Sequence, residues 1–321
     1  MRRMRGAALL VALVLLGVIG GLITRLSGDF VLERRRAQNL LEAEQAWQYL
    51  VGMEGIAAAV LAADDPTRDH TAEAWAAPIV LDLPGGARVS ARIEDLQGRL
   101  PLNALRRARS VDGAAEEVPS TEPERRFIRL LVASSGGLLD QQDARALIEA
   151  LVDWLDPDDV ETGFGGAETS HFRRQIPPIR PANGPARSVS ELRVLPGVSP
   201  ELYERIAPLL SVWPLRGATV NINTAPPPVL LALLQEASVG TNDLPERLVE
   251  ARQESGFDSI GRFLDIAGED ATVDIAGLSL RSDWFLVHSE VLYRGEIWRL
   301  QSVLQRRKSE LRIVARAMGE L

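Results

Sequence analysis

The chain has 321 residues, enough for one large or two small domains, and its 46% hydrophobic and 25% charged residues are typical of globular proteins. The net charge of −8 argues against broad nucleic-acid binding, because phosphate recognition usually needs a basic surface. The chain has no cysteine, which excludes disulfides, thiol catalysis and thiolate metal sites.

A basic N-terminus precedes the first apolar segment. Residues 7–23 contain no charged side chain, with Arg2, Arg3 and Arg5 before them and Arg25 after them. At a rise of 1.5 Å per residue this segment forms a helix about 26 Å long, which just crosses a hydrocarbon core of roughly 30 Å. Because basic flanks stay in the cytoplasm, the rest of the chain is expected on the outer side of an inner membrane.

The sequence that follows predicts a continuous helix and not the cleavage region of a secretory signal peptide. Such a peptide ends in small residues followed by polar turn residues, whereas residues 27–64 contain no proline and many helix formers. Leu40, Trp47 and Leu50 belong to a pattern that recurs at intervals of three and four residues. We therefore expect one helix over residues 7–65, which spans the membrane and continues as an amphipathic stem.

Two regions alternate apolar and polar residues as β-strands do. After a polar connection that ends near residue 78, two runs separated by Gly85-Gly86 predict a hairpin. Three further runs, with turns at Arg294-Gly295 and Lys308-Ser309, predict an antiparallel meander at the end of the chain. The five runs cover residues 79–84, 87–95, 284–295, 296–307 and 310–320.

Between these strand regions the periodicity is helical, and several segments begin with Ser, Asp or Pro at the N-cap or in the first turn. The expected helices cover residues 122–134, 140–155, 188–195, 199–212, 226–237, 243–255 and 259–268. Because strands lie on both sides, we expect an all-helical domain over residues 104–281, inserted into a small α/β domain made of residues 66–103 and 282–321. The expected fold class is α+β, with an N-terminal transmembrane and stem helix, an antiparallel sheet and this large helical insertion.

Residues 153–172 hold the densest group of oxygen ligands in the chain. Several carboxylates in a loop suit Ca²⁺, which takes six to eight oxygen ligands in a flexible geometry, better than Mg²⁺ or Zn²⁺. Mutual repulsion would also disfavour the closed loop without a cation. The spacing is not that of an EF-hand, and a solvated acidic loop without a metal is the alternative. The acidic residues are Asp153, Asp156, Asp158, Asp159, Glu161 and Glu168.

Other functions have weaker support. Residues 195–206 resemble one half of a helix-hairpin-helix, whose glycine turn presents backbone N–H groups to a DNA phosphate, so an envelope-anchored DNA-binding protein of a competence system is the alternative function. The acidic balance and the single lysine, Lys308, favour a generic turn between packed helices. The chain has three histidines and no G-x-S-x-G motif, and we expect neither an enzyme nor an organic cofactor.

The first residues carry a family resemblance. The leader MRRMRG, followed directly by the apolar AALLVALVLL, resembles the prepilin-type signal of type IV pilins and type II secretion pseudopilins. This resemblance implies that a prepilin peptidase cuts between Gly6 and Ala7, on the cytoplasmic side, and that the new N-terminus is methylated. Residues 1–6 are then a leader, and the apolar helix remains in the mature protein.

A second set of segments resembles, in order, the K-type minor pseudopilins of the type II secretion system. That family has a pseudopilin fold with a large helical domain inserted into its sheet, and it binds calcium in the helical domain. The segments are EDLQGRLPLNAL at 94–105, LVDWLDPDD at 151–159, GGAET at 165–169, IRPANGP at 179–185, SVSELRVLPGVSPELYERIAPLL at 188–210 and VNINTAPPPVLLALL at 220–234.

The resemblance implies a calcium-ligand set in this chain. The family's acidic positions match Asp153, Asp156, Asp158 and Glu168 most closely, and Asn183 is an additional oxygen donor. Where the family often has a second acid after Gly-Ala-Glu, this chain has Thr169, so Asp159 or Glu161 is a candidate substitute.

Val11, the fifth residue of the mature chain, carries a further implication. Most pilins and pseudopilins have a glutamate there, which pairs with the N-terminal amine of a neighbouring subunit. A subunit without a neighbour above it needs no such carboxylate, which is costly in lipid when unpaired. The resemblance therefore implies a subunit at the pseudopilus tip that helps to initiate assembly for the export of folded proteins.

The resemblance also implies partners and a location. The expected partners are the I-type and J-type minor pseudopilins, the major pseudopilin and the inner-membrane assembly platform, with the secretin or exported substrates as further contacts and no nucleic acid. The expected location is the bacterial inner membrane, with one membrane span, a cytoplasmic N-terminus and a periplasmic globular part.

Overall fold

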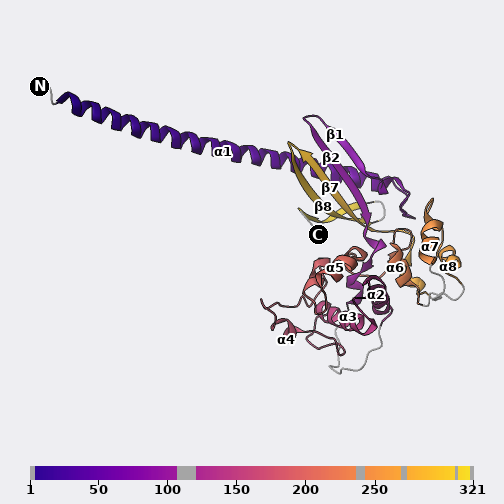
Figure 1. Cartoon of the computed structure of the whole chain (residues 1–321). Coiled ribbons are helices and arrows are strands. Elements are labelled where there is room, and N and C mark those ends of the chain that lie inside the picture. The colour runs from indigo at the N-terminus through magenta and orange to yellow at the C-terminus, as the bar shows by residue number, and fades with distance from the viewer. Residues whose placement is uncertain (1–3, 107–120, 236–242, 269–272, 308–309, 319–321) are drawn as a thin grey trace.

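The computed structural model describes residues 4–106, 121–235, 243–268, 273–307 and 310–318. Figure 1 shows three parts: a long N-terminal helix, an antiparallel sheet against its C-terminal portion, and a group of helices at the end of the sheet away from the N-terminus. The expected α+β fold class is confirmed.

Helix α1 (Met4–Ala62) is continuous and has two environments. Its N-terminal apolar segment is exposed, and the helix is long enough and apolar enough to cross a membrane. Its last turns bury Leu50, Met53, Ala57 and Leu61, each at most 1% exposed, against the sheet. The spacing of three and four residues places these side chains on one face. Of the predicted amphipathic pattern, Leu50 lies on this face, whereas Leu40 is 72% exposed.

The sheet has the strand order β1-β2-β7-β8-β9, and all its neighbours are antiparallel. The expected hairpin forms with Gly85 and Gly86 at φ +89° and +81°, and the expected turn at Arg294-Gly295 also has two positive φ angles. The expected turn at Lys308-Ser309 lies outside the described residues. The strands are β1 (Ile79–Leu83), β2 (Ala87–Asp95), β7 (Trp284–Tyr293), β8 (Glu296–Arg307) and β9 (Glu310–Ala317).

The helical domain connects β2 to β7, which are adjacent in the sheet. Asp95 at the end of β2 lies opposite Phe285 at the start of β7. The expected limits of the insertion, residues 104 and 281, fall inside this connection, but Leu100 and Leu102 already belong to the core of the helical domain. Its helices are α2 (Glu122–Ser134), α3 (Gln141–Leu155), α4 (Thr169–Phe172), α5 (Pro200–Ile206), α6 (Pro227–Leu233), α7 (Leu244–Arg252) and α8 (Ile260–Ala267).

Two expected helices differ in type from the structure, and the helix expected over residues 226–237 ends at Leu233. Residues 188–195 form a 3₁₀-helix, Val189–Val194, and the segment 199–212 ends as a short strand. Helix α5 stops at Ile206 because Pro208 has no N–H with which to continue the hydrogen-bond ladder. Two small parallel pairs complete this domain: β3 (Leu100–Pro101) with β4 (Leu210–Ser211), and β5 (Val220–Asn221) with β6 (Leu278–Ser279).

A buried polar network joins the sheet to the helical domain. The carboxylate of Asp95 accepts hydrogen bonds from Asn221 Nδ2 at 3.0 Å and from Thr224 Oγ1 and Ser282 Oγ at 2.5 Å each. These donors come from the helical domain and from the segment that leads back to the sheet. The network therefore fixes the helical domain against the end of β2.

Candidate metal centre

Helix α3 positions the acidic loop. Asp140 caps its N-terminus by accepting a hydrogen bond from Asp143 N at 2.8 Å. Leu147, Leu151 and Leu155 lie in the core of the helical domain, so the C-terminal end of the helix is held in place. The acidic loop begins directly after this fixed end and runs to α4.

Two carboxylates of α3 fold the loop back onto the helix. Asp153, fully buried, accepts hydrogen bonds from Thr162 N at 3.0 Å and Ala167 N at 2.8 Å. Glu149 accepts one from Gly165 N at 2.8 Å. A Cβ at Gly165 would overlap the backbone of α3, so only glycine permits this close approach.

The folded loop brings three carboxylates together. One oxygen each of Asp156, Asp158 and Glu168 lies within 4.8 Å of the others. Asp156 and Glu168 are buried, with 5% and 2% exposure. Burial, together with the charges of nearby acidic residues, raises the pKa of Glu168 to about 8. Three acidic groups therefore share a place with little water, where burial and their mutual repulsion favour the protonated form of Glu168 unless a cation is bound.

Unpaired buried oxygens show what this site can hold. Both carboxylate oxygens of Glu168 are buried without a hydrogen-bond partner among the described residues, and so is Asn183 Oδ1. Asn183, at φ +42°, is fixed by a hydrogen bond of 2.9 Å from its Nδ2 to the carbonyl oxygen of Asp158. Because buried acceptors without partners are costly, and because the donor set is oxygen alone, the residues fit a hard cation of the calcium class.

The other predicted ligands have different contacts. Asp153 holds the loop through backbone N–H groups. Asp159 is exposed and accepts a hydrogen bond from Thr169 N at 3.2 Å. Glu161 contacts Ser170 Oγ at 3.5 Å on the surface. The structure thus gathers Asp156, Asp158 and Glu168 from the predicted set, with Asn183 hydrogen-bonded to the main chain of Asp158. Asp153, Asp159 and Glu161 lie outside this group.

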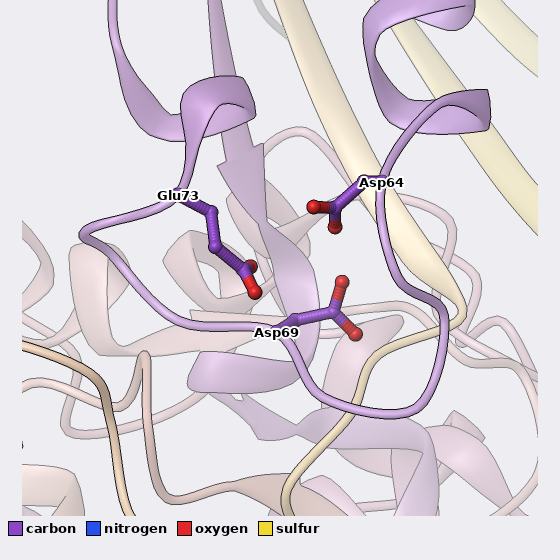
Figure 2. Close-up of side chains that lie close together, drawn as sticks. All are labelled: Asp64, Asp69 and Glu73. Carbon is purple, nitrogen blue, oxygen red and sulfur yellow. The ribbon is translucent and has the colours of Figure 1, made fainter.

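A second acidic cluster has no counterpart in the sequence predictions. Figure 2 shows Asp64, Asp69 and Glu73 with their carboxylates turned toward one another in the loop after α1. Arg306 forms an ion pair with Asp69 and lies 3.8 Å from Asp64. Because a guanidinium already supplies positive charge, this cluster is a salt-bridge junction between the stem and β8. Its partner is distant in sequence, so no local pattern indicated it.

The arginines near the predicted helix-hairpin-helix have partners within the domain. The Arg193 guanidinium lies 4.1 Å from the centre of the Tyr203 ring, and Arg205 pairs with Glu201 at 3.0 Å. Gly197, at φ +83°, forms the turn before α5. These contacts agree with a turn between packed segments, and the DNA-binding alternative gains no support.

Comparison with known proteins finds relatives that match nearly the whole length of the chain. Two family models, both described as "Type II secretion system (T2SS), protein K", match residues 98–215 and 220–281. A "Type II secretion system protein K" from Pseudomonas aeruginosa is 35% identical over 99% of this chain and 94% of its own length. One from Aeromonas hydrophila is 30% identical over 99% of this chain and 98% of its own length.

A solved structure shares the fold. It is "The Crystal Structure of the GspK-GspI-GspJ complex from enterotoxigenic Escherichia coli Type 2 Secretion System", in which the matching chain is 23% identical with a TM-score of 0.76. The match covers 89% of this chain and 100% of that chain. Two family models match residues 98–215 and 220–281, and a relative is 35% identical over 99% of the chain, so the chain belongs to the family of type II secretion system protein K.

Proposed function

We propose that this chain is a minor pseudopilin that occupies the tip of a periplasmic pseudopilus and helps to initiate its assembly for the export of folded proteins. The position of the helical domain carries the proposal. It lies at the end of the sheet away from the N-terminal end of α1, where the next subunit of a filament would stack (Figure 1). A domain of this size would obstruct such stacking.

The exposed part of α1 supports a membrane anchor. Its side chains from Leu9 to Ile23 have no partner within the described chain, and its composition suits lipid. In this proposal the N-terminus is cytoplasmic, and the sheet and helical domain are periplasmic. A prepilin peptidase cuts between Gly6 and Ala7, and the new N-terminus is methylated.

Val11 agrees with a place at the tip. Its side chain is 59% exposed on α1 and has no charge. A subunit inside a filament gains from a carboxylate at this position, because that carboxylate pairs with the N-terminal amine of its neighbour. A terminal subunit has no such amine to bind, and a valine avoids the cost of an unpaired carboxylate in lipid.

The structural relative supports the choice of partners. Its name places GspK in a complex with GspI and GspJ. For this chain we propose the I-type and J-type minor pseudopilins as direct partners, and the major pseudopilin and assembly platform as partners during assembly. The secretin or exported substrates contact the helical domain. Nucleic acid and enzymatic catalysis have no part in this function.

The metal centre stabilises the tip domain. We propose that Ca²⁺ binds Asp156, Asp158 and Glu168, with Asn183 as a further oxygen donor. The chain has no cysteine for disulfides, so a bound cation is the means by which a periplasmic helical domain gains stability. The unpaired, buried oxygens of Glu168 support this assignment most directly.

The test of the tip position uses a host that lacks its own protein K and forms long pseudopili. An epitope-tagged full chain is expected to restore secretion and to give label at pseudopilus ends. In a matched variant a short turn joins Asp95 to Trp284, which is feasible because Asp95 lies opposite Phe285. This variant should lose secretion or enter the filament shaft. Label of the intact chain along the whole shaft would contradict the proposal.

A further inference from the structure

A groove of about 790 Å³ lies beside the metal centre. Arg173, which follows α4, and the segment from Pro178 to Asn183 form its walls. Asn183 links the groove to the metal centre, since its side chain donates a hydrogen bond to the main-chain oxygen of Asp158 in the acidic cluster. Whatever enters the groove therefore lies next to the charges of the metal centre.

The two arginines of the groove are available for a ligand. Arg173 and Arg180 are exposed and form no close ion pair with any residue that the structure describes, although Arg173 adds, after the hydrogen bonds from Thr169, to the lowering of the pKa of Asp159. The only acidic side chain in the lining is Asp159, which accepts the backbone N–H of Thr169. A guanidinium binds a carboxylate through two parallel hydrogen bonds, so these arginines fit carboxylates of a partner.

The rest of the wall suits an extended polypeptide. Pro178, Ile179 and Pro181 add apolar surface to the lining of the groove. Proline fixes φ, so this wall loses little conformational freedom when it binds. An extended segment with acidic side chains would contact this apolar surface and place carboxylates near the arginines of the same groove.

We propose that this groove binds an acidic, extended segment of a partner polypeptide through Arg173 and Arg180, and that Ca²⁺ at the adjacent metal centre strengthens this binding. The second part rests on the cation site proposed above. Without a cation, the carboxylates of Asp158 and Asp159 beside the groove repel an acidic ligand. With Ca²⁺ bound, most of that negative charge is neutralised and the field of the two arginines dominates.

The test uses the full chain in detergent and a fluorescein-labelled hexaglutamate peptide, followed by fluorescence anisotropy at low salt. Binding is expected in Ca²⁺ and weaker in EGTA, with no binding of the matched hexaglutamine peptide. The double variant Arg173→Gln/Arg180→Gln should weaken binding about tenfold or more. Arg174→Gln removes an exposed arginine of the same segment that does not line the groove, and should change the affinity less than about twofold.

Calcium-dependent melting, measured on the same samples, separates the two proposals. If Ca²⁺ raises the melting temperature but hexaglutamate does not bind, the groove assignment is overturned and the cation site stands. The same conclusion follows if Arg174→Gln weakens hexaglutamate binding as much as the double variant does. If Ca²⁺ changes neither melting nor affinity while the double variant still loses binding, the groove is supported and its control by calcium is overturned.

Discussion

At the scale of single residues, Glu168 combines burial with two carboxylate oxygens that have no hydrogen-bond partner among the described residues. Ca²⁺ is therefore expected to raise the melting temperature of the chelator-treated full chain, and Glu168→Gln should remove most of that rise. Glu161→Gln is the control, because Glu161 lies on the surface of the same loop. Calorimetry with and without Ca²⁺ measures both, and an equal rise in the two variants would rule out Glu168 as a ligand.

Glu94 on β2 gives a prediction about acid stability. Although burial opposes ionisation, hydrogen bonds from His288 and Arg99 lower the pKa of Glu94 to about 2 from 4.5. In the unfolded chain the carboxyl titrates near 4.5, so the stability that it contributes is complete above that pH and is lost as the pH falls toward 2. Glu94→Gln should therefore flatten the pH dependence of the unfolding free energy between these values.

Urea unfolding of the full chain in detergent, followed by tryptophan fluorescence from about pH 2 to pH 6, measures this dependence. Glu290→Gln serves as the control, since Glu290 pairs with Arg299 on an exposed part of the sheet. The prediction fails if the wild type and Glu94→Gln lose stability in parallel as the pH is lowered.

At the scale of elements, α1 combines an exposed apolar segment, long enough to cross a membrane, with a face that packs on the sheet. Leu50 on α1 is fully buried in the core between the helix and the sheet, whereas Leu40 is 72% exposed. Leu50→Ala should lower the free energy of unfolding by about 2–5 kcal/mol, through lost burial and the cavity left behind. Leu40→Ala should change it by less than about 0.5 kcal/mol. Denaturant titration compares them, and equal losses would mean that α1 does not pack on the sheet as described.

The elements also show where sequence patterns succeed. The strands and the long helices were predictable, because a periodicity of two or of three to four residues is a local property that burial on one face imposes. The segment 199–212 was not, because its apolar residues suit a helix or a strand. The pairing of β4 with β3, about 110 residues earlier in the chain, decides between them, and Pro208 ends the helix.

At the scale of the whole molecule, the Asp95 network joins the two domains. Asn221 Nδ2 lies within 3.1 Å of Asp95, Ser282 and the carbonyl oxygen of Asp69. Asn221→Ala should cost about 1–3 kcal/mol, because it leaves buried acceptors without a donor. It should also separate the unfolding of the helical domain from that of the sheet.

Differential scanning calorimetry together with limited proteolysis tests this coupling. The wild type should show one transition, and the variant two, with cleavage between β2 and the helical domain. Gln142→Ala, on the exposed side of α3, should behave as the wild type does. A single unshifted transition in Asn221→Ala would contradict this role for Asn221 and mean that the remaining contacts, such as the hydrogen bond of Thr224 to Asp95, hold the domains together.

The sequence by itself determined the apolar N-terminal helix, the stem, the strands and most helices, and its ordered motifs indicated the family that the comparisons confirm. It also located the acidic loop. Only the tertiary structure decided which acids meet, because Asp153 turns toward backbone N–H groups while Glu168 turns into the cluster. It also decided the Asp69–Arg306 pair and the Asp95 network, whose members come together only after residues up to 237 positions apart have folded against each other. Local periodicity contains no information about such distant pairs.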